Sequence, residues 1–365
     1  MNNDNYPVLN PEYGANYIGG ESVQQILLAK AFAKRGHEVS TIVADLGQQD
    51  GEIIDDVRVL TTFSPGSGLP VLRFIHPKIT SIVSALRRAD ADIYYQSCAG
   101  MFTGVTAWFA QRHKRKFIFR VASDSDCIPG QQLVRYWRDK KIYEYGLKNA
   151  DLISVQSARQ AALLKDNYKL ESLKLNMVAE PPDDLNRERD IDVLWVNNFR
   201  ALKKPERVLE LARMLPDVNF TMVGGPCPGE QSLYDDVHAQ VKTIKNIHMT
   251  GFVPYHKVNS YYSRARVFIN TSIIEGFPNS YLQSWVRGTP VITFLDPDDL
   301  IMRNGLGYRS DSVKDMADAI RDHLDDGACW EQTSARSRSY AIDNYHPDGI
   351  AEKYENIFKG IGIAG

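Results

Sequence analysis

The residues of this chain best suited to chemistry lie in the stretch 275–285, which begins Glu-Gly-Phe-Pro. A predicted strand over 267–270 precedes it, and a helix is predicted over 280–286. Asn279 and Ser280 are suitable N-cap residues, and Gly288 stands where a glycine often ends a helix. The start of a helix favours an anion such as a diphosphate. Glu275, on the preceding loop, is placed either to accept hydrogen bonds from sugar hydroxyls or to serve as a helix-capping or surface carboxylate.

The elements that must position this stretch follow one rhythm, in which short apolar runs alternate with longer helical patterns. Strands in the first half are predicted over 38–43, 92–96, 116–121 and 152–156. Strands in the second half are predicted over 192–197, 219–224, 246–250, 267–270 and 290–294. Predicted helices include 22–35, 205–215, 232–243, 258–264 and 280–286. This βα alternation predicts parallel sheets with helices on both faces.

A length of 365 residues exceeds one typical hydrophobic core and suggests two domains. The polar, proline-rich segment 180–190 interrupts the βα rhythm and is the predicted linker. We therefore expect an α/β chain of two doubly wound, Rossmann-like domains that face each other across a cleft. The expected N-terminal, acceptor-side domain covers 1–180, and the expected C-terminal, nucleotide-binding domain covers 181–345. A helix is predicted at 347–359, and the segment 346–365 is a candidate to pack back on the N-terminal domain.

Several segments of the second half occur together in one known family. They are Asn-Ile-x-x-x-Gly-Phe-Val-Pro at 246–254, Tyr-Tyr-x-x-Ala at 261–265, Glu-Gly-Phe-Pro at 275–278 and Gly-Thr-Pro-Val-Ile at 288–292. Together they resemble the family-4 retaining glycosyltransferases, also called glycosyl transferases group 1, which have the GT-B fold. The resemblance implies transfer of a sugar from a UDP- or GDP-sugar donor to a hydroxyl acceptor, with no metal and no cofactor.

The resemblance also implies roles for individual residues. The loop at 195–206 is similar to the family's strand-end loop, in which an arginine and a lysine hold the donor diphosphate. Arg200 and Lys203 match these two, although Asn198 occupies the register where the arginine often lies. The implied catalytic residues are therefore Glu275, Lys203 and Arg200. The implied donor-binding residues are Gly19, Gly20, Asn198, Gly276, Phe277, Pro278, Asn279, Ser280, Tyr281 and Gln283.

The Gly19-Gly20 pair belongs to a loop and helix near the N-terminus that are similar to the family's first loop and helix. Gly20 there lets main-chain N–H groups come close to a phosphate. The alternative is an ordinary turn.

Three features depart from the family's pattern. Gln283 replaces the second glutamate of the Glu-x7-Glu pair, which binds the nucleotide ribose in the family. A neutral acceptor is weaker by about 1 kcal/mol, so donor affinity should suffer more than chemistry. The first-domain strand 116–121 is not followed by the family's histidine. Acceptor-side candidates there are Ser123, Asp124 and Asp126, or these residues simply close a turn.

The third departure concerns the start of the chain. The opening strand of the family is represented only by 6–10, which contains Pro7. A proline suits a sheet edge or the start of a strand better than a central strand. We expect either a short strand here or a sequence that begins late.

The cysteines and the N-terminus bear on the compartment. The four cysteines are far apart and show no metal-ligand spacing, so we expect reduced thiols and no structural zinc. The polar N-terminus lacks the features of a secretory signal, and no apolar run approaches the roughly 20 residues that span a bilayer. These features predict a cytoplasmic protein.

The stretch 112–148 holds ten basic and four acidic residues. This excess is consistent with a solvated helix face, or with an anionic acceptor or lipid headgroups at the inner membrane face. Nucleic acid is not expected, because no recognised binding motif accompanies the charge. The expected partners are thus the nucleotide-sugar donor, a carbohydrate or lipid-linked acceptor, and the membrane surface through 112–148.

Retention is a feature of the implied mechanism. Retaining hydrolases use two carboxylates about 5 Å apart, and the sequence offers no such pair. The resemblance implies instead a same-face substitution in which the leaving diphosphate helps to deprotonate the acceptor, while the protein positions the reactants and stabilises charge. Two alternatives remain open. One is a GT-B nucleotide-sugar epimerase or phosphorylase, and the other is a non-catalytic nucleotide-sugar-binding protein.

Overall fold

The computed structural model describes residues 5–14, 17–69, 73–182 and 188–362, which form two compact units. Unit 1 consists of the chain up to Tyr13, Gly19–Met177 and the chain from Pro347 onward. Unit 2 consists of Gly14–Ile18 and Val178–His346. Apart from the short segment Gly14–Ile18, the chain changes unit after Met177 and again after His346, whereas the sequence placed these boundaries at 180 and 345.

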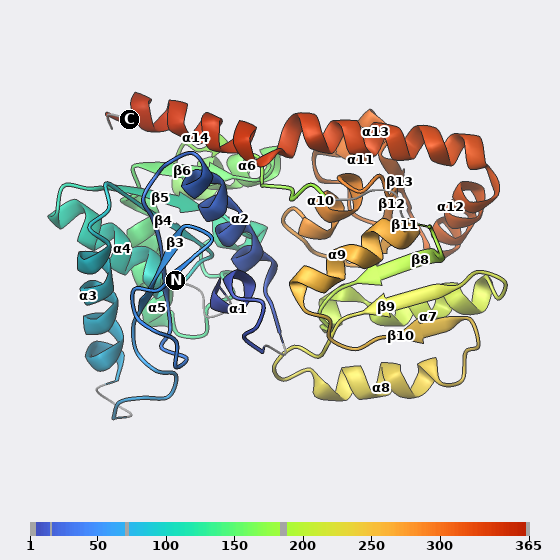
Figure 1. Ribbon diagram of the computed structural model, residues 1–365, viewed down its shortest axis with the longest axis horizontal. Coiled ribbons are helices and arrows are strands. Elements are labelled where there is room, and N and C mark those ends of the chain that lie inside the picture. The colour runs from blue at the N-terminus through green and yellow to red at the C-terminus, as the bar shows by residue number, and fades with distance from the viewer. Residues whose placement is uncertain (1–4, 15–16, 70–72, 183–187, 363–365) are drawn as a thin grey trace. The chain divides into compact units, whose positions relative to one another are not determined.

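Unit 2 is built on one six-stranded, fully parallel sheet (Figure 1). Its strands are β8 (Ile191–Val196), β9 (Phe220–Val223), β10 (Ile247–Met249), β11 (Ala265–Asn270), β12 (Val291–Thr293) and β13 (Gly307–Arg309). The spatial order is β10-β9-β8-β11-β12-β13. The chain thus builds outward from β8 in one direction and then from β11 in the other, which is the doubly wound order that the βα alternation predicts.

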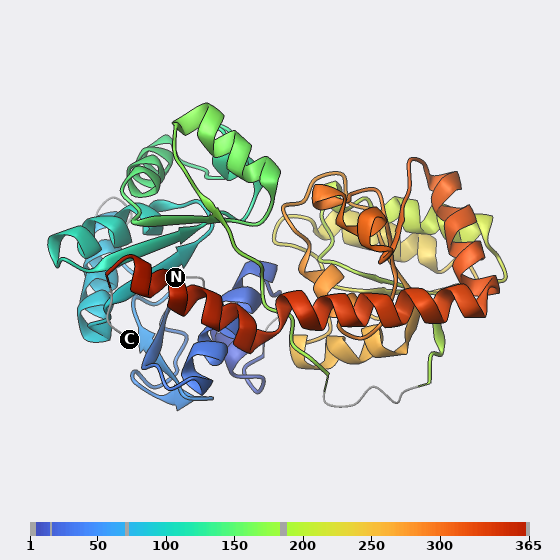
Figure 2. The same ribbon diagram turned by 90° about the horizontal axis from the view of Figure 1, so that it is seen from above.

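Helices lie on both faces of this sheet (Figures 1 and 2). They are α7 (Pro205–Met214), α8 (Gln231–Val241), α9 (Tyr255–Arg264), α10 (Asn279–Trp285), α11 (Leu300–Asn304), α12 (Val313–Asp325) and α13 (Gly327–Tyr345). Alternate strand residues serve the two faces. Trp195 and Ile269 pack into a buried core with α7, α8 and α12, whereas Phe268 contacts Tyr262 of α9 with ring centroids 5.4 Å apart.

Unit 1 contains two groups of strands. Sheet β1-β3-β2 is formed by β1 (Val39–Val43), β2 (Ile53–Ile54) and β3 (Val57–Thr61), and sheet β4-β5-β6-β7 by β4 (Ile93–Ser97), β5 (Lys116–Arg120), β6 (Leu152–Val155) and β7 (Leu173–Lys174). The helices are α2 (Gly20–Lys34), α3 (Thr80–Ala89), α4 (Met101–Arg112), α5 (Trp137–Lys148) and α6 (Ala158–Tyr168). Phe117 and Phe119 of β5 are fully buried against α3 to α6. The predicted α/β class is confirmed.

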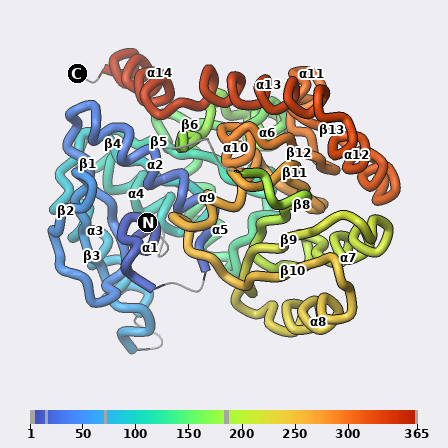
Figure 3. Tube along the Cα trace, turned by 45° about the vertical axis from the view of Figure 1, so that its right-hand side comes forward, coloured from blue at the N-terminus to red at the C-terminus, as the bar shows by residue number. Residues whose placement is uncertain are grey.

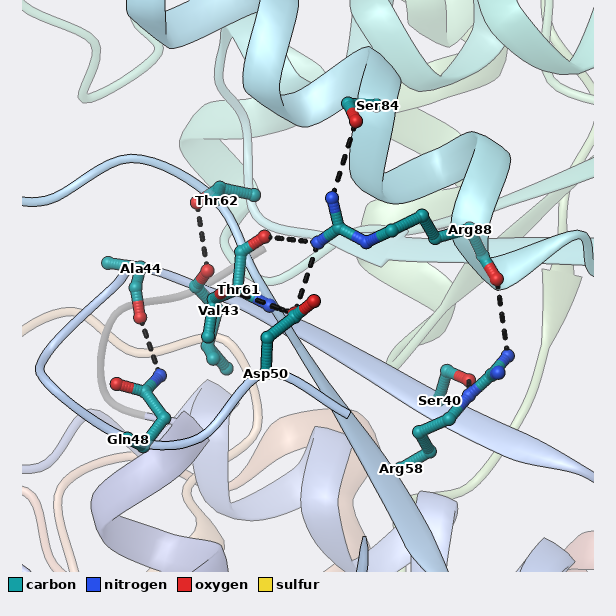
Figure 4. Close-up of polar contacts among 10 residues, drawn as sticks. All are labelled: Ser40, Val43, Ala44, Gln48, Asp50, Arg58, Thr61, Thr62, Ser84 and Arg88. Atoms are coloured by element: carbon teal, nitrogen blue, oxygen red, sulfur yellow. Dashed lines mark hydrogen bonds and ion pairs between the residues drawn. The ribbon is translucent and has the colours of Figure 1, made fainter. Parts of the chain in front are cut away.

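Polar contacts tie α3 to the β1-β3-β2 sheet (Figure 4). Arg88 donates to the carboxylate of Asp50 at 3.1 Å and to the carbonyl of Thr61 at 2.6 Å. Arg58 donates to Ser40 at 3.1 Å and to the carbonyl of Arg88 at 3.3 Å. Burial raises the pKa of Asp50, but hydrogen bonds from Thr61 and the charge of Arg88 outweigh it and lower the pKa. The network therefore stabilises the helix on the sheet when Asp50 is ionised.

The helix α14 (Pro347–Gly360) lies next to α2 in unit 1 (Figures 1 and 3). Phe358 stacks on Phe32 of α2, with centroids 5.6 Å apart. The carboxylate of Glu355 accepts two hydrogen bonds from Arg35, at 2.6 and 2.8 Å, and contacts Nε2 of His37 at 3.0 Å. The last helix is thus part of the first unit.

The predicted strand at 6–10 is wrong, because the segment forms the helix α1 (Asn5–Leu9). Pro7 lies in the first turn, where its missing N–H would have no partner in a helix anyway. The N–H of Asn10 closes the turn on the carbonyl of Tyr6 at 2.8 Å. Tyr6 and Leu9 are buried, so one apolar turn satisfies the core without a strand. Among the described residues, no helix combines the length and apolar character needed to cross a bilayer.

Candidate active site

The carboxyl ends of β8 and β11 lie side by side in the middle of the unit 2 sheet, since the two strands pair directly. This is the point at which the strand order reverses, and open α/β sheets bind ligands there. After β8 the chain forms a short 3₁₀ turn, Ala201–Lys203, and after β11 it forms the loop that leads to α10. The two stretches singled out by the sequence therefore meet at one edge of the sheet.

Thr271 holds these two loops together. Its buried hydroxyl accepts a hydrogen bond from Nε1 of Trp195 at 2.9 Å and donates to the carbonyl of Lys203 at 2.7 Å. The N–H of Ile273 donates to the carbonyl of Leu202 at 3.0 Å. Sequence reasoning missed Thr271, whose one local signal is its position directly after a predicted strand.

Lys203 and Glu275 come together across the two loops. The ammonium of Lys203 forms an ion pair with Oε1 of Glu275, and the hydroxyl of Ser272 donates to the same oxygen at 2.8 Å. Their side chains are 15% and 16% exposed, so the pair is accessible without being free in solvent. Partial burial strengthens such a pair relative to a fully exposed one.

Arg200 and Asn198 lie on the same loop as Lys203. Among the described residues, the half-buried guanidinium of Arg200 has no hydrogen-bond or ion-pair partner, so its five donors are available to an anion. The amide of Asn198 instead donates to the carbonyl of Ile18 at 2.9 Å. Among the described residues, Arg200 thus has donors that are unpaired, whereas the Asn198 amide is already bound.

The helix α10 begins differently from the prediction. Its N-cap residue is Pro278, and Asn279 is its first residue, so the predicted N-cap at Asn279 or Ser280 is wrong. The proline needs no donor partner and sets an extended conformation ahead of the helix. The end of the helix is as predicted, since Gly288 has φ +66 and the N–H of Thr289 donates to the carbonyl of Ser284.

Two of the expected donor-binding side chains are buried in the core of unit 2. The hydroxyl of Tyr281 contacts Oγ1 of Thr293 at 2.6 Å and donates to the carbonyl of Leu295 at 2.8 Å. The ring of Phe277 packs against Tyr281 and Tyr345. Both side chains therefore serve the core of unit 2. Gly276, Asn279 and Ser280 are partly exposed on the same loop and first turn, and Pro278 is buried.

Gln283 belongs to a polar chain on one side of α10. Its amide nitrogen donates to Oδ1 of Asn259 at 3.0 Å, and the amide of Asn259 donates to Glu180 at 3.2 Å. The hydroxyl of Tyr255 also donates to Glu180 at 3.1 Å. The side chain of Asn259 thus connects the carboxylate of Glu180 to the position where the family has its second glutamate. Glu180 was expected only as part of the linker 180–190, of which residues 183–187 lie outside the described chain.

The strand ends at this edge carry unused polar groups. Among the described residues, the buried amide nitrogens of Asn197 and Asn270 have no hydrogen-bond partner. Leaving a buried donor unpaired costs about 1–3 kcal/mol, so a polar ligand or water there would stabilise the edge. Gly224, which follows β9 directly, has φ +148, and a Cβ on it would lie 1.8 Å from the carbonyl oxygen of Asn197. Only glycine allows this close approach.

The acceptor-side candidates lie in unit 1, after β5. Ser123 is the N-cap of a 3₁₀ turn, Asp124–Cys127, and Asp126 accepts hydrogen bonds from the N–H groups of Ala122 and Ser123. Burial raises the pKa of Asp126 to about 6. Asp124 pairs with Arg159 at 3.0 Å. The side chains of Ser123 and Asp126 therefore close the turn, as the alternative interpretation proposed.

The remaining candidates, Gly19 and Gly20, also lie in unit 1. Gly19 is the N-cap residue of α2, with φ −81 and ψ 140, and Gly20 is its first residue. The 15-residue helix thus starts at the predicted glycine pair. Among the residues that the structure describes, no group of three or more His, Cys, Asp or Glu side chains is arranged to hold a metal.

Comparison with known proteins covers both units. Residues 18–179 match the family described as "Glycosyltransferase Family 4", and residues 192–326 match the one described as "Glycosyl transferases group 1". The chain belongs to the family-4 glycosyltransferases. The *Escherichia coli* O-antigen biosynthesis glycosyltransferase WbnH is 25% identical over 198 residues, which are 51% of this chain and 52% of the relative. The chain therefore matches about half the length of this curated relative.

Two solved structures have the same fold. Sucrose-phosphate synthase from *Thermosynechococcus elongatus* has a TM-score of 0.77 at 17% identity, over 97% of each chain. *Anabaena* HepE, solved with UDP and glucose, has a TM-score of 0.73 at 13% identity, over 95% of this chain and 98% of that one. The predicted GT-B fold is confirmed.

Proposed function

We propose that this glycosyltransferase moves a sugar from a UDP- or GDP-sugar to a hydroxyl acceptor, with retention and without a divalent metal. The observation that carries the proposal is the meeting of Lys203 and Glu275 at the switch point of the unit 2 sheet, with Arg200 unpaired among the described residues on the same loop. Two cations and one carboxylate are the charges that a diphosphate joined to a sugar requires.

The proposed roles follow from the chemistry of the side chains. The donor diphosphate binds Arg200 and takes Lys203 as a second partner, which leaves Glu275 to accept hydrogen bonds from the sugar hydroxyls. Gln283 contacts the ribose, with Glu180 behind it through Asn259. The main chain of Gly276 to Ser280 supplies further N–H donors to the phosphates.

In the proposed reaction, the bond between the anomeric carbon and the diphosphate oxygen breaks as the acceptor oxygen approaches from the same face. The bonding electrons leave with the diphosphate, and the acceptor proton passes to one of its oxygens. Arg200 and Lys203 stabilise the negative charge that develops on the leaving group. Removing one such donor typically costs a factor of about 10²–10³ in rate.

The acceptor is proposed to be a carbohydrate or a lipid-linked glycan, by analogy with the O-antigen relative. The proposed compartment is the cytoplasm, where the four cysteines, all free thiols in the structure, would stay reduced. We also propose that the basic stretch 112–148 contacts the membrane surface.

The test is a screen of UDP- and GDP-sugars in EDTA, with glycan and lipid-linked acceptors. Product formation and the configuration of the new bond are read by NMR. Transfer with retention by the wild type, lowered by orders of magnitude in a stably folded Lys203→Ala variant, is the expected result. Loss of turnover in EDTA, an inverted product, or an unaffected Lys203→Ala variant would contradict the proposal. Conversion of the donor sugar without an acceptor would identify an epimerase.

A further inference from the structure

Unit 1 contains a cavity of about 660 Å³ that the proposed transfer reaction does not use. Two charged segments line it, one around the π-helical turn Phe74–Ile79 and one at the start of α5, together with Phe63, Gly66 and Ser67. The residues that give it chemical character are Arg73, Lys78, Tyr136, Trp137, Arg138 and Asp139. The second segment falls within the basic stretch 112–148, whose role the sequence left open.

Positive charge is in excess in this cavity. Arg73, Lys78 and Arg138 face a single lining carboxylate, Asp139, which is already bound by Nε of Arg138 at 2.9 Å. Burial lowers the pKa of Lys78, and the nearby charges of Arg138 and Arg73 lower it further, against the opposite effect of Asp139. Concentrated charge of one sign attracts a ligand of the other sign, so the cavity is suited to an anion.

Apolar and aromatic side chains accompany the cations. The guanidinium of Arg138 lies over the ring of Phe74, 3.4 Å from its centroid. Trp137, at the start of α5, is 78% exposed, and Tyr136 before it is also exposed. Leu69, Ile75 and Leu133, each within three residues of a lining residue in the chain, are exposed as well. Exposed tryptophan and tyrosine next to basic residues are typical of surfaces that lie at a membrane interface.

We propose that this cavity binds the phosphate of an anionic lipid headgroup and that Trp137 enters the adjoining interfacial layer of the bilayer. Arg73 and Lys78 contact the phosphate, since Arg138 is shared with Asp139 and Phe74. The charge favours an anionic surface over a neutral one, and the exposed apolar side chains favour a bilayer over a soluble phosphate. The proposal rests on the membrane contact proposed for 112–148 and narrows it to residues 136–139, so that Arg112 is not part of the contact. It concerns unit 1 alone and does not depend on transfer by unit 2.

The test is cosedimentation of the full chain with phosphatidylcholine vesicles that contain or lack phosphatidylglycerol. Arg73→Ala and Trp137→Ala are the test variants, because both side chains are exposed and their loss should leave the fold intact. Arg112→Ala and Trp108→Ala are the matched controls on α4. Lys78 lies over Phe102 of that helix, and Arg112 is ten residues further on, about 15 Å along the axis and beyond the screening length.

We expect wild-type binding only to the anionic vesicles. Arg73→Ala should weaken it about fivefold, as expected for one basic side chain at an anionic surface, and Trp137→Ala should weaken it by a similar factor. Both control variants should bind as the wild type does. Equal losses in Arg112→Ala, or no vesicle binding at all, would overturn the proposal. The proposal would also be overturned if inorganic phosphate raised the melting temperature of the wild type, but not that of Arg73→Ala, while the wild type did not bind vesicles. UDP should stabilise Arg73→Ala as much as it stabilises the wild type. This control shows that the substitution leaves the proposed donor site intact.

Discussion

At the scale of single residues, the hydroxyl of Thr271 connects three parts of the candidate site. It bonds the Trp195 indole of β8 and the main chain of Lys203, and it follows β11 directly. The two charged groups therefore meet because an uncharged, buried side chain joins the loops that carry them. Thr271 is a positioning residue, since it acts through Lys203 and Glu275.

Replacing this hydroxyl should loosen the site. In Thr271→Val the buried Nε1 of Trp195 and the carbonyl of Lys203 lose their partner at nearly constant side-chain volume. We expect a loss of about 1–3 kcal/mol in the free energy of unfolding, and a lower kcat without a matching rise in KM. Thr271→Ser keeps the hydroxyl and should restore most of both quantities. Equal effects of valine and serine in denaturation and in kinetics would refute the role of the hydroxyl.

Glu275 offers a sharper chemical test. Glu275→Gln keeps the shape of the side chain but removes the charge that strengthens hydrogen bonds from sugar hydroxyls. Transfer should fall by about tenfold to a hundredfold. Affinity for the nucleoside diphosphate should stay the same or rise, because Lys203 is released from its ion pair. A variant with weaker diphosphate binding and normal turnover would show that Glu275 has a different role.

At the scale of elements, α14 and α2 show how the end of the chain is fixed to unit 1. Phe32 and Phe358 supply the apolar contact, and Arg35 and His37 bind Glu355. The hydrogen bond from Arg35, followed by that from His37, lowers the pKa of Glu355 to about 2. Because the folded pKa lies below the unfolded value of about 4.5, this carboxylate stabilises the fold above pH 4.5.

The stabilisation should disappear as the pH falls from about 4.5 toward 2, where Glu355 takes up its proton. Glu355→Gln should cost about 1 kcal/mol or less at neutral pH, as expected for a pair near the surface. The difference from wild type should shrink in acid, which urea denaturation across this range measures. A difference between wild type and Glu355→Gln that stays constant across this range would contradict the role of Glu355.

At the scale of the whole molecule, the strand order of unit 2 explains why residues 72 positions apart share a site. The sequence predicted both loops, because each follows a strand with a clear apolar pattern, and parallel strands present their carboxyl ends at one edge. The sequences of β8 and β11 do not by themselves predict that these strands pair, because strand order depends on the packing of the whole unit. The family resemblance, instead, predicted that Lys203 and Glu275 belong to one site.

Other features escaped prediction for local physical reasons. The segment 6–10 alternates too briefly to separate a strand from one helical turn, and burial of Tyr6 and Leu9 favours the turn. The sequence did not show which side of α10 faces the core, and this decides that the Tyr281 hydroxyl lies against Thr293. The cavity of unit 1 brings together Phe74 and Arg138, which are distant in the chain, so their contact has no signal in the spacing of residues.

The most direct test of the account is calorimetric titration of the chain with UDP and GDP in EDTA. The wild type should bind one of them, and saturation at about 100 times Kd should add about 2.7 kcal/mol of stability. Lys203→Ala should bind at least about tenfold more weakly, because a diphosphate loses one cationic partner. Lys314→Ala, an exposed lysine of α12, should bind as the wild type does. No binding of either nucleotide without metal, or equal binding by Lys203→Ala, would contradict the account.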